Sequence, residues 1–213
     1  MPAKPAPAAE VRERVMAGMI IAVEEHGYAN TTVGDIAKAA RISRRTLYEH
    51  FPDKQACFLA AYGRIADQLM SEVVTAARAA PPGPERTHTA VKSYLHALAL
   101  SPEVARSFLT EIKAVGPEGL ELYCHVTQRF ATMFVDLIEE TTDSMGDVPA
   151  DELPELLPFD QTYALALAGA INELVLQAIV GGPPQTLPGR LERLAEPVTE
   201  LVQRLTFREP RPS

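Results

Sequence analysis

Apolar residues at three- and four-residue spacing fill almost the whole chain, and this spacing limits its fold more than any other feature. An α-helix has 3.6 residues per turn, so side chains at this spacing share one helical face. No segment alternates apolar and polar residues for long enough to predict a strand. Prolines and glycines, as in the run at 81–84, separate the helical stretches. The sequence therefore predicts an all-α fold.

The same punctuation predicts where individual helices end. The first helix is expected to stop at His26-Gly27, and Pro52 is expected to open a long helix that reaches Ala80. Pro197 is expected to kink the last helix, because proline removes a backbone hydrogen bond. A long loop is expected at 143–158. The expected helices cover residues 11–26, 33–40, 44–51, 52–80, 85–100, 102–115, 117–145, 159–180 and 188–207.

Charge is unevenly distributed along the chain. The 213 residues carry a net charge of −8, yet residues 1–60 carry +1 and the remainder −9. Within residues 38–54 five basic side chains stand against two acidic ones. A small polyanion-binding head on a larger acidic body would have this distribution. A solvated basic face without a partner would give the same count, so charge alone does not decide between them.

Two short helices, each with its own cap, lie in or beside this basic segment. Thr32 precedes one and Ser43 the other, and both hydroxyls can accept a hydrogen bond from a first-turn N–H. Helices this short are marginal alone and must be held by packing. With the turn at 40–42 they form a helix-turn-helix. The expected buried faces are Ile36, Ala37, Ile42, Leu47 and Phe51, closed by Val15, Met19 and Val23 of the first helix.

The second short helix is expected to present a basic, polar face outward. Arg44 and Arg45 are the candidates for base contacts, because a guanidinium matches the O6/N7 pair of guanine in the major groove. Thr46 is short enough to touch a phosphate or a thymine methyl group. The expected phosphate contacts, which fix register, are made by Thr32, Tyr48, His50 and Lys54. The predicted DNA-binding set is Thr32, Arg41, Ser43, Arg44, Arg45, Thr46, Tyr48, His50 and Lys54.

Residues 31–54 resemble a known family. The resemblance is carried by Thr31-Thr32-Val33-x-x-Ile36-Ala37-x-x-Ala40-x-Ile42-Ser43-x-x-Thr46-Leu47-Tyr48-x-His50-Phe51-x-x-Lys54, which is similar to the N-terminal domain of the tetracycline-repressor (TetR) family. The similarity extends over residues 11–62. It implies a homodimeric transcriptional regulator whose C-terminal domain holds an effector pocket. Because members of the family are commonly repressors, it also implies a repressor. The implied partners are double-stranded DNA with an inverted-repeat operator, a second copy of the chain and a small, mostly apolar effector, with no cofactor.

Two positions depart from the family pattern. Arg41 stands where glycine is common, and a positive φ there would strain a non-glycine residue by roughly 1 kcal/mol. Arg45 stands where small residues are common. Simpler interpretations also stay open: Thr32 and Ser43 as caps only, Tyr48 as a core residue, His50 facing solvent, and the adjacent arginines as ordinary surface charge.

The last two helices carry small residues between larger apolar ones, and the apolar set is wider than one buried stripe. They are expected to form half of a four-helix bundle completed by a second subunit. Alternatively, both helices could only cover the core of their own chain. A two-fold arrangement would place two recognition helices about 34–36 Å apart, on successive major grooves. The candidate interface residues are Ala164, Leu167, Ile171, Leu174, Val175, Leu194, Val198 and Leu201.

Aromatic and methionine residues scattered over the central helices predict a cavity for an apolar or amphipathic ligand. The candidate lining residues are Tyr94, Phe108, Phe130 and Phe134, although ordinary core packing would explain each one singly. The predicted organisation is a flexible N-terminal arm at 1–10, a DNA-binding domain at 11–57, an effector-binding and dimerisation domain at 58–207, and a tail at 208–213.

Other functional classes find less support. An enzyme would need paired residues, but His88, His96, His125, Asp136 and Glu173 fall in no HxxxH or ExxH arrangement, and no metal site is expected. A helical adaptor without DNA binding stays an alternative.

The expected location is the cytoplasm. Cys57 and Cys124 have no CxxC partner, so both are expected to be reduced, buried thiols. The apolar stretch 163–182 is interrupted by Asn172-Glu173, which favours a buried helix over a membrane span.

Overall fold

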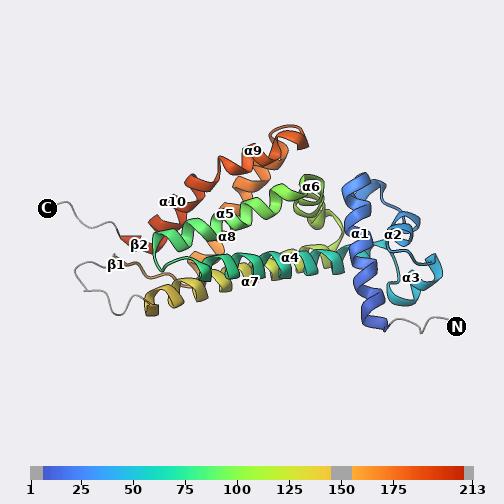
Figure 1. Cartoon of the computed structure of the whole chain (residues 1–213), viewed down its shortest axis with the longest axis horizontal. Coiled ribbons are helices and arrows are strands. Elements are labelled where there is room, and N and C mark those ends of the chain that lie inside the picture. Colours follow the sequence, from blue (N-terminus) through green and yellow to red (C-terminus); the bar gives the residue numbers. More distant parts are fainter. Residues whose placement is uncertain (1–6, 145–154, 209–213) are drawn as a thin grey trace. The chain divides into compact units, whose positions relative to one another are not determined.

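The computed structural model describes residues 7–144 and 155–208 (Figure 1). Over these residues the all-α fold class is confirmed. Most of the predicted N-terminal arm, loop 143–158 and C-terminal tail lies outside the described residues. The helices are α1 (Ala8–Asn30), α2 (Val33–Ala39), α3 (Arg44–His50), α4 (Lys54–Ala79), α5 (Pro84–Leu100), α6 (Pro102–Glu111), α7 (Pro117–Ser144), α8 (Gln161–Val180), α9 (Leu187–Glu192) and α10 (Ala195–Thr206), with 3₁₀ turns η1 (Ile112–Ala114) and η2 (Pro184–Thr186).

Two short strands were not predicted. β1 (Glu155–Leu156) pairs antiparallel with β2 (Phe207–Arg208), with Leu156 opposite Phe207. Two residues are too few to leave an alternating pattern in a sequence, so this pairing could not be read from the periodicity.

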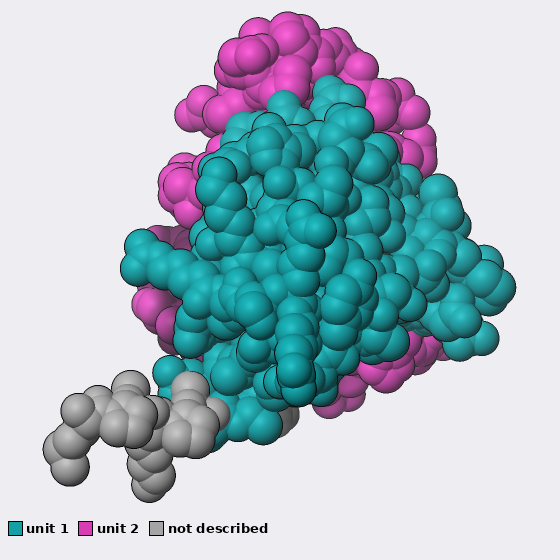
Figure 2. Space-filling model, turned by 90° about the vertical axis from the view of Figure 1, so that its right-hand side faces the viewer, with its two compact units in different colours: residues 1–66, 101–123 teal, residues 67–100, 124–213 magenta. Residues whose placement is uncertain are grey.

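The described chain divides into two compact units, coloured separately in Figure 2. Unit 1 contains Met1–Ala66 and Ser101–Tyr123, and unit 2 contains Asp67–Leu100 and Cys124–Ser213. The sequence placed a boundary after residue 57, so unit 1 also takes in the start of α4 and the whole of α6. Whether residues 11–57 act as the DNA-binding domain is a functional prediction that this division does not test.

The core of the helix-turn-helix lies in unit 1 and uses the predicted residues. Val15, Met19 and Val23 of α1 are fully buried, as are Ile36 of α2 and Leu47 of α3. Seven-residue helices gain little stability from their own hydrogen bonds, so this shared apolar contact holds α2 and α3 in place. Ala37 and Phe51 are buried beside them, and Ile42 is half-buried in the turn.

A second part of the unit 1 core is aromatic and brings α6 against α1 and α4. The Phe58 ring lies 4.2 Å from the Tyr28 ring and 4.7 Å from the Phe108 ring, measured between centroids. Phe108 also stacks on Tyr62 at 5.9 Å. Aromatic pairs at these separations add to the stabilisation from burial alone. Phe108 is therefore a core residue of unit 1.

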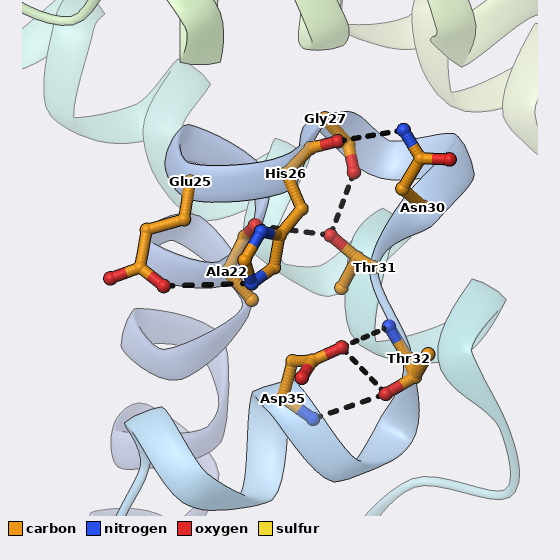
Figure 3. A network of polar contacts seen from close by, with 8 residues as sticks. All are labelled: Ala22, Glu25, His26, Gly27, Asn30, Thr31, Thr32 and Asp35. Carbon is orange, nitrogen blue, oxygen red and sulfur yellow. Dashed lines mark hydrogen bonds and ion pairs between the residues drawn. The ribbon is translucent and has the colours of Figure 1, made fainter.

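Gly27 breaks α1 near its end, as the sequence predicts (Figure 3). Its φ is +70°, where a side chain would be strained and glycine is not. The buried Thr31 hydroxyl donates to Gly27 O at 2.8 Å and lies 3.1 Å from Ala22 O, so carbonyls freed at the break are satisfied. The chain then turns directly into the Thr32 cap of α2.

Helix ends near prolines differ in detail from the prediction. The last helix is broken at Arg193-Leu194 rather than kinked at Pro197, which lies in the first turn of α10. A first-turn residue needs no intrahelical N–H partner, so the proline fits there and forces the break upstream. Likewise α4 begins at Lys54, after Pro52, and Asp53 Oδ1 accepts from Ala56 N at 2.7 Å.

In unit 2, α8 supplies six buried residues: Ala164, Leu167, Ala168, Ile171, Val175 and Ile179. By length and composition alone α8 would also be long and apolar enough to cross a membrane, and it is the one helix of which this holds among the described residues. Core helices of globular proteins pass the same test, and the buried face of α8 packs in this way. Its other face carries exposed Leu165 and Tyr163.

Candidate nucleic-acid interface and ligand cavity

Helix α3 presents its polar face outward because its cap and its one buried residue fix its orientation. Ser43 Oγ accepts from Thr46 N at 3.0 Å, and Leu47 is fully buried. The opposite side then carries Arg44, Arg45 and Tyr48, and Tyr48 is 54% exposed. This exposure excludes Tyr48 as a core residue. The surface offers cationic and hydroxyl donors of the kind that contact phosphates and base edges.

The two arginines of α3 differ in their surroundings. The Arg45 side chain is 90% exposed, and its Nε lies 3.3 Å from Glu49 Oε1 in an ion pair along the helix. Arg44 lies over α2, because a Cβ built on Gly34 would come 2.4 Å from Arg44 NH2. Gly34 therefore leaves room for the Arg44 guanidinium. The sequence analysis did not single out Gly34, since a glycine near a helix start gives no signal of what lies above it.

The structure gives Thr32 and Ser43 their capping roles. Thr32 Oγ1 donates to Asp35 Oδ2 at 2.6 Å and accepts from Asp35 N at 3.2 Å, while Thr32 N donates to the same carboxylate at 2.9 Å. This reciprocal capping box uses the hydroxyl proton of Thr32 within the chain. These hydrogen bonds also lower the pKa of Asp35. Contacts of Thr32 and Ser43 with DNA stay predictions.

Arg41 has a φ of 55°, as expected if the position favours glycine. Its side chain is exposed, and its backbone carbonyl accepts from Arg14 NH2 at 2.8 Å. Arg14 NH2 also donates to Ala40 O at 2.8 Å. Arg14 thus holds the turn of the helix-turn-helix from α1, which helps to keep Arg41 in its strained conformation.

Lys54 and His50 both make contacts within the chain that the sequence did not predict. Lys54 Nζ donates to Tyr28 O at 3.0 Å and lies 4.3 Å from the centre of the Tyr28 ring. An ammonium has three donors, so two remain for a phosphate. His50 is half-buried, and its carbonyl accepts from Arg12 NH1 at 2.8 Å. Arg12 also lies 4.2 Å from the Phe51 ring centre, a role that its charge alone did not reveal.

Unit 2 contains a cavity of about 80 Å³, where roughly 10–15 Å³ would hold one water. Three of the four predicted lining residues, Tyr94, Phe130 and Phe134, line it. Phe108 does not, because it is packed in the core of unit 1. The wall is mostly apolar, from α4, α5, α7, α8 and α10. Arg86 also lines the cavity, and nothing in the sequence distinguishes it from an ordinary surface arginine.

The predicted dimer-interface residues divide into two groups. Ala164, Leu167, Ile171, Val175 and Val198 are buried inside unit 2 itself, so their surfaces are not open to a partner. Leu174, Leu194 and Leu201 are half-buried. The outward face of α8 instead carries Leu165, Ala166, Gly169 and Ala170, and a Cβ built on Gly169 meets nothing within 4 Å.

The remaining candidates are histidines, cysteines and carboxylates. Among the described residues no cluster of three or more His, Cys, Asp or Glu could hold a metal ion. His88 Nδ1 pairs with Thr199 Oγ1 at 3.3 Å in unit 2. Burial raises the pKa of the Cys57 thiol to about 12, so this thiol stays protonated. Cys124 is exposed, contrary to the expectation that both thiols are buried, because it lies on the outer side of α7.

Comparisons with known proteins agree with this geometry. The family model for bacterial regulatory proteins of the tetR family matches residues 22–61. The chain is 26% identical over 168 residues to the HTH-type transcriptional regulator EthR of Mycolicibacterium smegmatis, a match covering 78% of this chain and 72% of the relative.

Solved structures share the fold over nearly the full length. A TetR-family transcriptional regulator from Pectobacterium atrosepticum superposes with a TM-score of 0.72 at 21% identity, covering 98% of this chain and 100% of the other. The regulator FadR from Bacillus subtilis, solved in complex with stearoyl-CoA, gives 0.66 at 15% identity, covering 89% and 96%. At such identities the likeness shows the fold alone.

Proposed function

We propose that this chain, which is a TetR-family transcriptional regulator and not an enzyme, binds an inverted-repeat operator as a homodimer and leaves it when a mostly apolar ligand fills its cavity. The observation that carries the DNA contact is the outward face of α3, where Arg44, Arg45 and Tyr48 are exposed on a helix fixed by its cap and by buried Leu47. A cytoplasmic location follows from this role.

Base and phosphate contacts are assigned to different residues. Arg45, whose side chain is 90% exposed, is assigned a base edge, with Arg44 beside it. Tyr48, His50, Lys54 and the exposed Arg41 are assigned phosphates, which fix register without reading sequence.

The proposed dimer uses the outward face of α8 together with α10. Small residues at Ala166, Gly169 and Ala170 let a second helix approach closely, and Leu165 is 40% exposed there. Because α8 and α10 are in contact within one unit, two copies would complete a four-helix bundle. A partner can reach these residues, whereas Ala164, Leu167, Ile171, Val175 and Val198 are buried within unit 2.

The cavity of unit 2 is proposed as the effector site. Its apolar wall suits a ligand with a hydrocarbon part. The stearoyl-CoA bound by the FadR structure of the same fold is consistent with such a ligand. The ligand would lower DNA affinity by favouring a spread of the two recognition helices that no longer matches successive major grooves.

The first test is retention of sheared source DNA by the purified protein at near-physiological salt, followed by sequencing. We expect a short inverted repeat. Arg45→Ala should relax the preference at one base pair by about 1–3 kcal/mol, while Lys54→Ala should weaken all sequences alike and flatten the salt dependence. Because Lys54 also holds Tyr28, its variant needs a melting temperature beside the binding curve. No retention by the native chain would favour a helical adaptor.

The dimer is tested separately by Ala166→Arg, which places a charge on the outward face of α8. We expect monomers in sedimentation together with loss of cooperative operator binding, since each half-site then binds alone. Ser71→Arg on the exposed side of α4 is the matched control and should stay dimeric. A dimeric Ala166→Arg variant would place the interface on another surface.

A further inference from the structure

The cavity of unit 2 contains one charged side chain among its described lining residues, Arg86 of α5, and its hydrogen bonding is incomplete. Arg86 Nε is buried and has no hydrogen-bond partner in the described part of the chain. Its terminal nitrogens donate to Thr141 Oγ1 at 3.3 Å and to Ala80 O at 3.4 Å, both longer than usual. A buried donor without an acceptor is costly, and it therefore indicates a missing partner.

One carboxylate, that of Glu140, feels the charge of Arg86, but it is bound by Arg78. Glu140 accepts from Arg78 Nε at 3.0 Å and from Arg78 NH2 at 2.5 Å. The hydrogen bonds from Arg78 lower the pKa of Glu140 most, and the charge of Arg86 contributes least. Within the described residues no carboxylate forms an ion pair with Arg86. Its positive charge is thus available to an acceptor inside the cavity.

The cavity has a polar end and an apolar end. At one end Arg86 of α5 meets Thr141 of α7. At the other end the Tyr94 and Phe130 rings of the same two helices lie 6.0 Å apart, edge to face. Eight residues of helix separate Arg86 from Tyr94, a rise of about 12 Å. Most of the other lining residues are apolar, among them Ala90, Val91, Met133, Phe134 and Leu137, while Thr87 and Asn172 are polar.

We propose that the ligand is an amphipathic acid, whose anionic oxygen accepts hydrogen bonds from Arg86 and whose hydrocarbon chain runs toward Tyr94 and Phe130. The inference rests on the proposed function, because it takes this cavity as the effector site. A guanidinium binds carboxylate and phosphate oxygens through its planar fork, and such charge-assisted bonds are stronger where water is excluded. The oxygen can belong to a free carboxylate or to the phosphates of a coenzyme A thioester.

The test is calorimetric titration of the full chain with decanoate, decanoyl-CoA and 1-decanol. We expect the native protein to bind at least one of the two acidic ligands roughly ten-fold or more tightly than the alcohol. Arg86→Met should weaken the acidic ligand roughly ten- to hundred-fold and leave the alcohol within about two- to three-fold. Continued binding of the alcohol would show that the cavity of the variant is intact.

Two further variants separate charge from shape. Lys92→Met removes an exposed cation from the same helix and should change none of the three affinities. Arg86→Lys keeps the charge without the fork and should restore part of the acid affinity. If Arg86→Met instead melts early, Arg86→Lys supplies the comparison.

Each outcome decides something. Preference for decanoate assigns the free carboxylate, and preference for decanoyl-CoA assigns the thioester; both support the inference. Equal affinity for acid and alcohol in the native protein, or equal losses for both in Arg86→Met, would overturn the role of Arg86. The proposed function would then stand if the alcohol still released the operator. Binding of none of the three overturns the inference, and operator retention, measured separately, decides whether the regulator proposal survives.

Discussion

The two units use their aromatic side chains in opposite ways. In unit 1 the rings of Tyr28, Phe58, Tyr62 and Phe108 stack into a filled core, with Phe58 fully buried. In unit 2 Tyr94, Phe130 and Phe134 line an open cavity and stay half-buried. Sequence analysis grouped Phe108 with the three cavity residues, because all four are aromatic residues of central helices. The difference teaches that residue type indicates burial but not whether the space beside the ring is filled.

The largest expected effect contrasts Phe58→Ala with Phe134→Ala. Removing the Phe58 ring leaves a hole between α1, α4 and α6, and should lower the free energy of unfolding by about 3–5 kcal/mol. Phe134 already borders empty space, so its loss should cost about 1–2 kcal/mol. Urea denaturation measures both. Equal losses would mean that the cavity is closed in solution.

Gly34→Ala should separate stability from DNA affinity within unit 1. The new Cβ would push the Arg44 guanidinium from its place, and operator affinity should fall by about 1–3 kcal/mol. The free energy of unfolding should rise by up to about 1 kcal/mol, because alanine favours the helix. Gly63→Ala on α4, where a Cβ meets nothing within 4 Å, is the matched control and should leave DNA binding unchanged. An unchanged operator affinity for Gly34→Ala would remove Arg44 from the interface.

Arg41→Gly should raise the free energy of unfolding by about 0.5–1 kcal/mol. It relieves a positive φ, although part of the gain is lost because glycine makes the unfolded chain more flexible. Lys38→Gly, an exposed helical position of α2, should lower stability by a similar amount. The midpoint of urea denaturation should therefore rise for Arg41→Gly and fall for Lys38→Gly. Weaker operator binding by Arg41→Gly would at the same time support a phosphate contact of the arginine.

The smallest effects concern two partly exposed carboxylates, one in each unit. The pKa of Asp35 is lowered by hydrogen bonds from Thr32, and that of Glu140 by hydrogen bonds from Arg78. A carboxylate whose pKa is lowered by folding stabilises the folded state fully at pH values above its ordinary pKa, which is 3.8 for Asp35 and 4.5 for Glu140. This stabilisation is lost as the pH falls below those values. Asp35→Asn and Glu140→Gln should each flatten the acid limb of a stability–pH curve. Added salt should weaken the Arg78–Glu140 pair more than the cap.

How much the sequence predicted depends on whether the signal is local. The caps at Thr32 and Ser43, the break at Gly27 and the outward face of α3 depend on residues within a few positions of one another, so they were predicted. The interface residues on α8 and α10 stay predictions, and five of the eight are buried within unit 2, because an apolar helix does not show which of its faces meets its own chain. The contacts of Arg12, Arg14 and Lys54 join α1 to residues 26 to 38 positions away and left no pattern to read.

The sequence by itself determined the all-α fold class, the helix-turn-helix and the resemblance to the TetR family, because helical periodicity, capping and the Leu47-Tyr48-x-His50-Phe51 string are properties of neighbouring residues. The tertiary structure decided where empty space remains. It packed Phe108 against the α4 rings Phe58 and Tyr62, left Tyr94 and Phe130 at a cavity, and buried Arg86 Nε there without a partner among the described residues. The residues that pack around a side chain come from several helices and are distant in the sequence. The space left beside that side chain therefore cannot be predicted from its sequence neighbours.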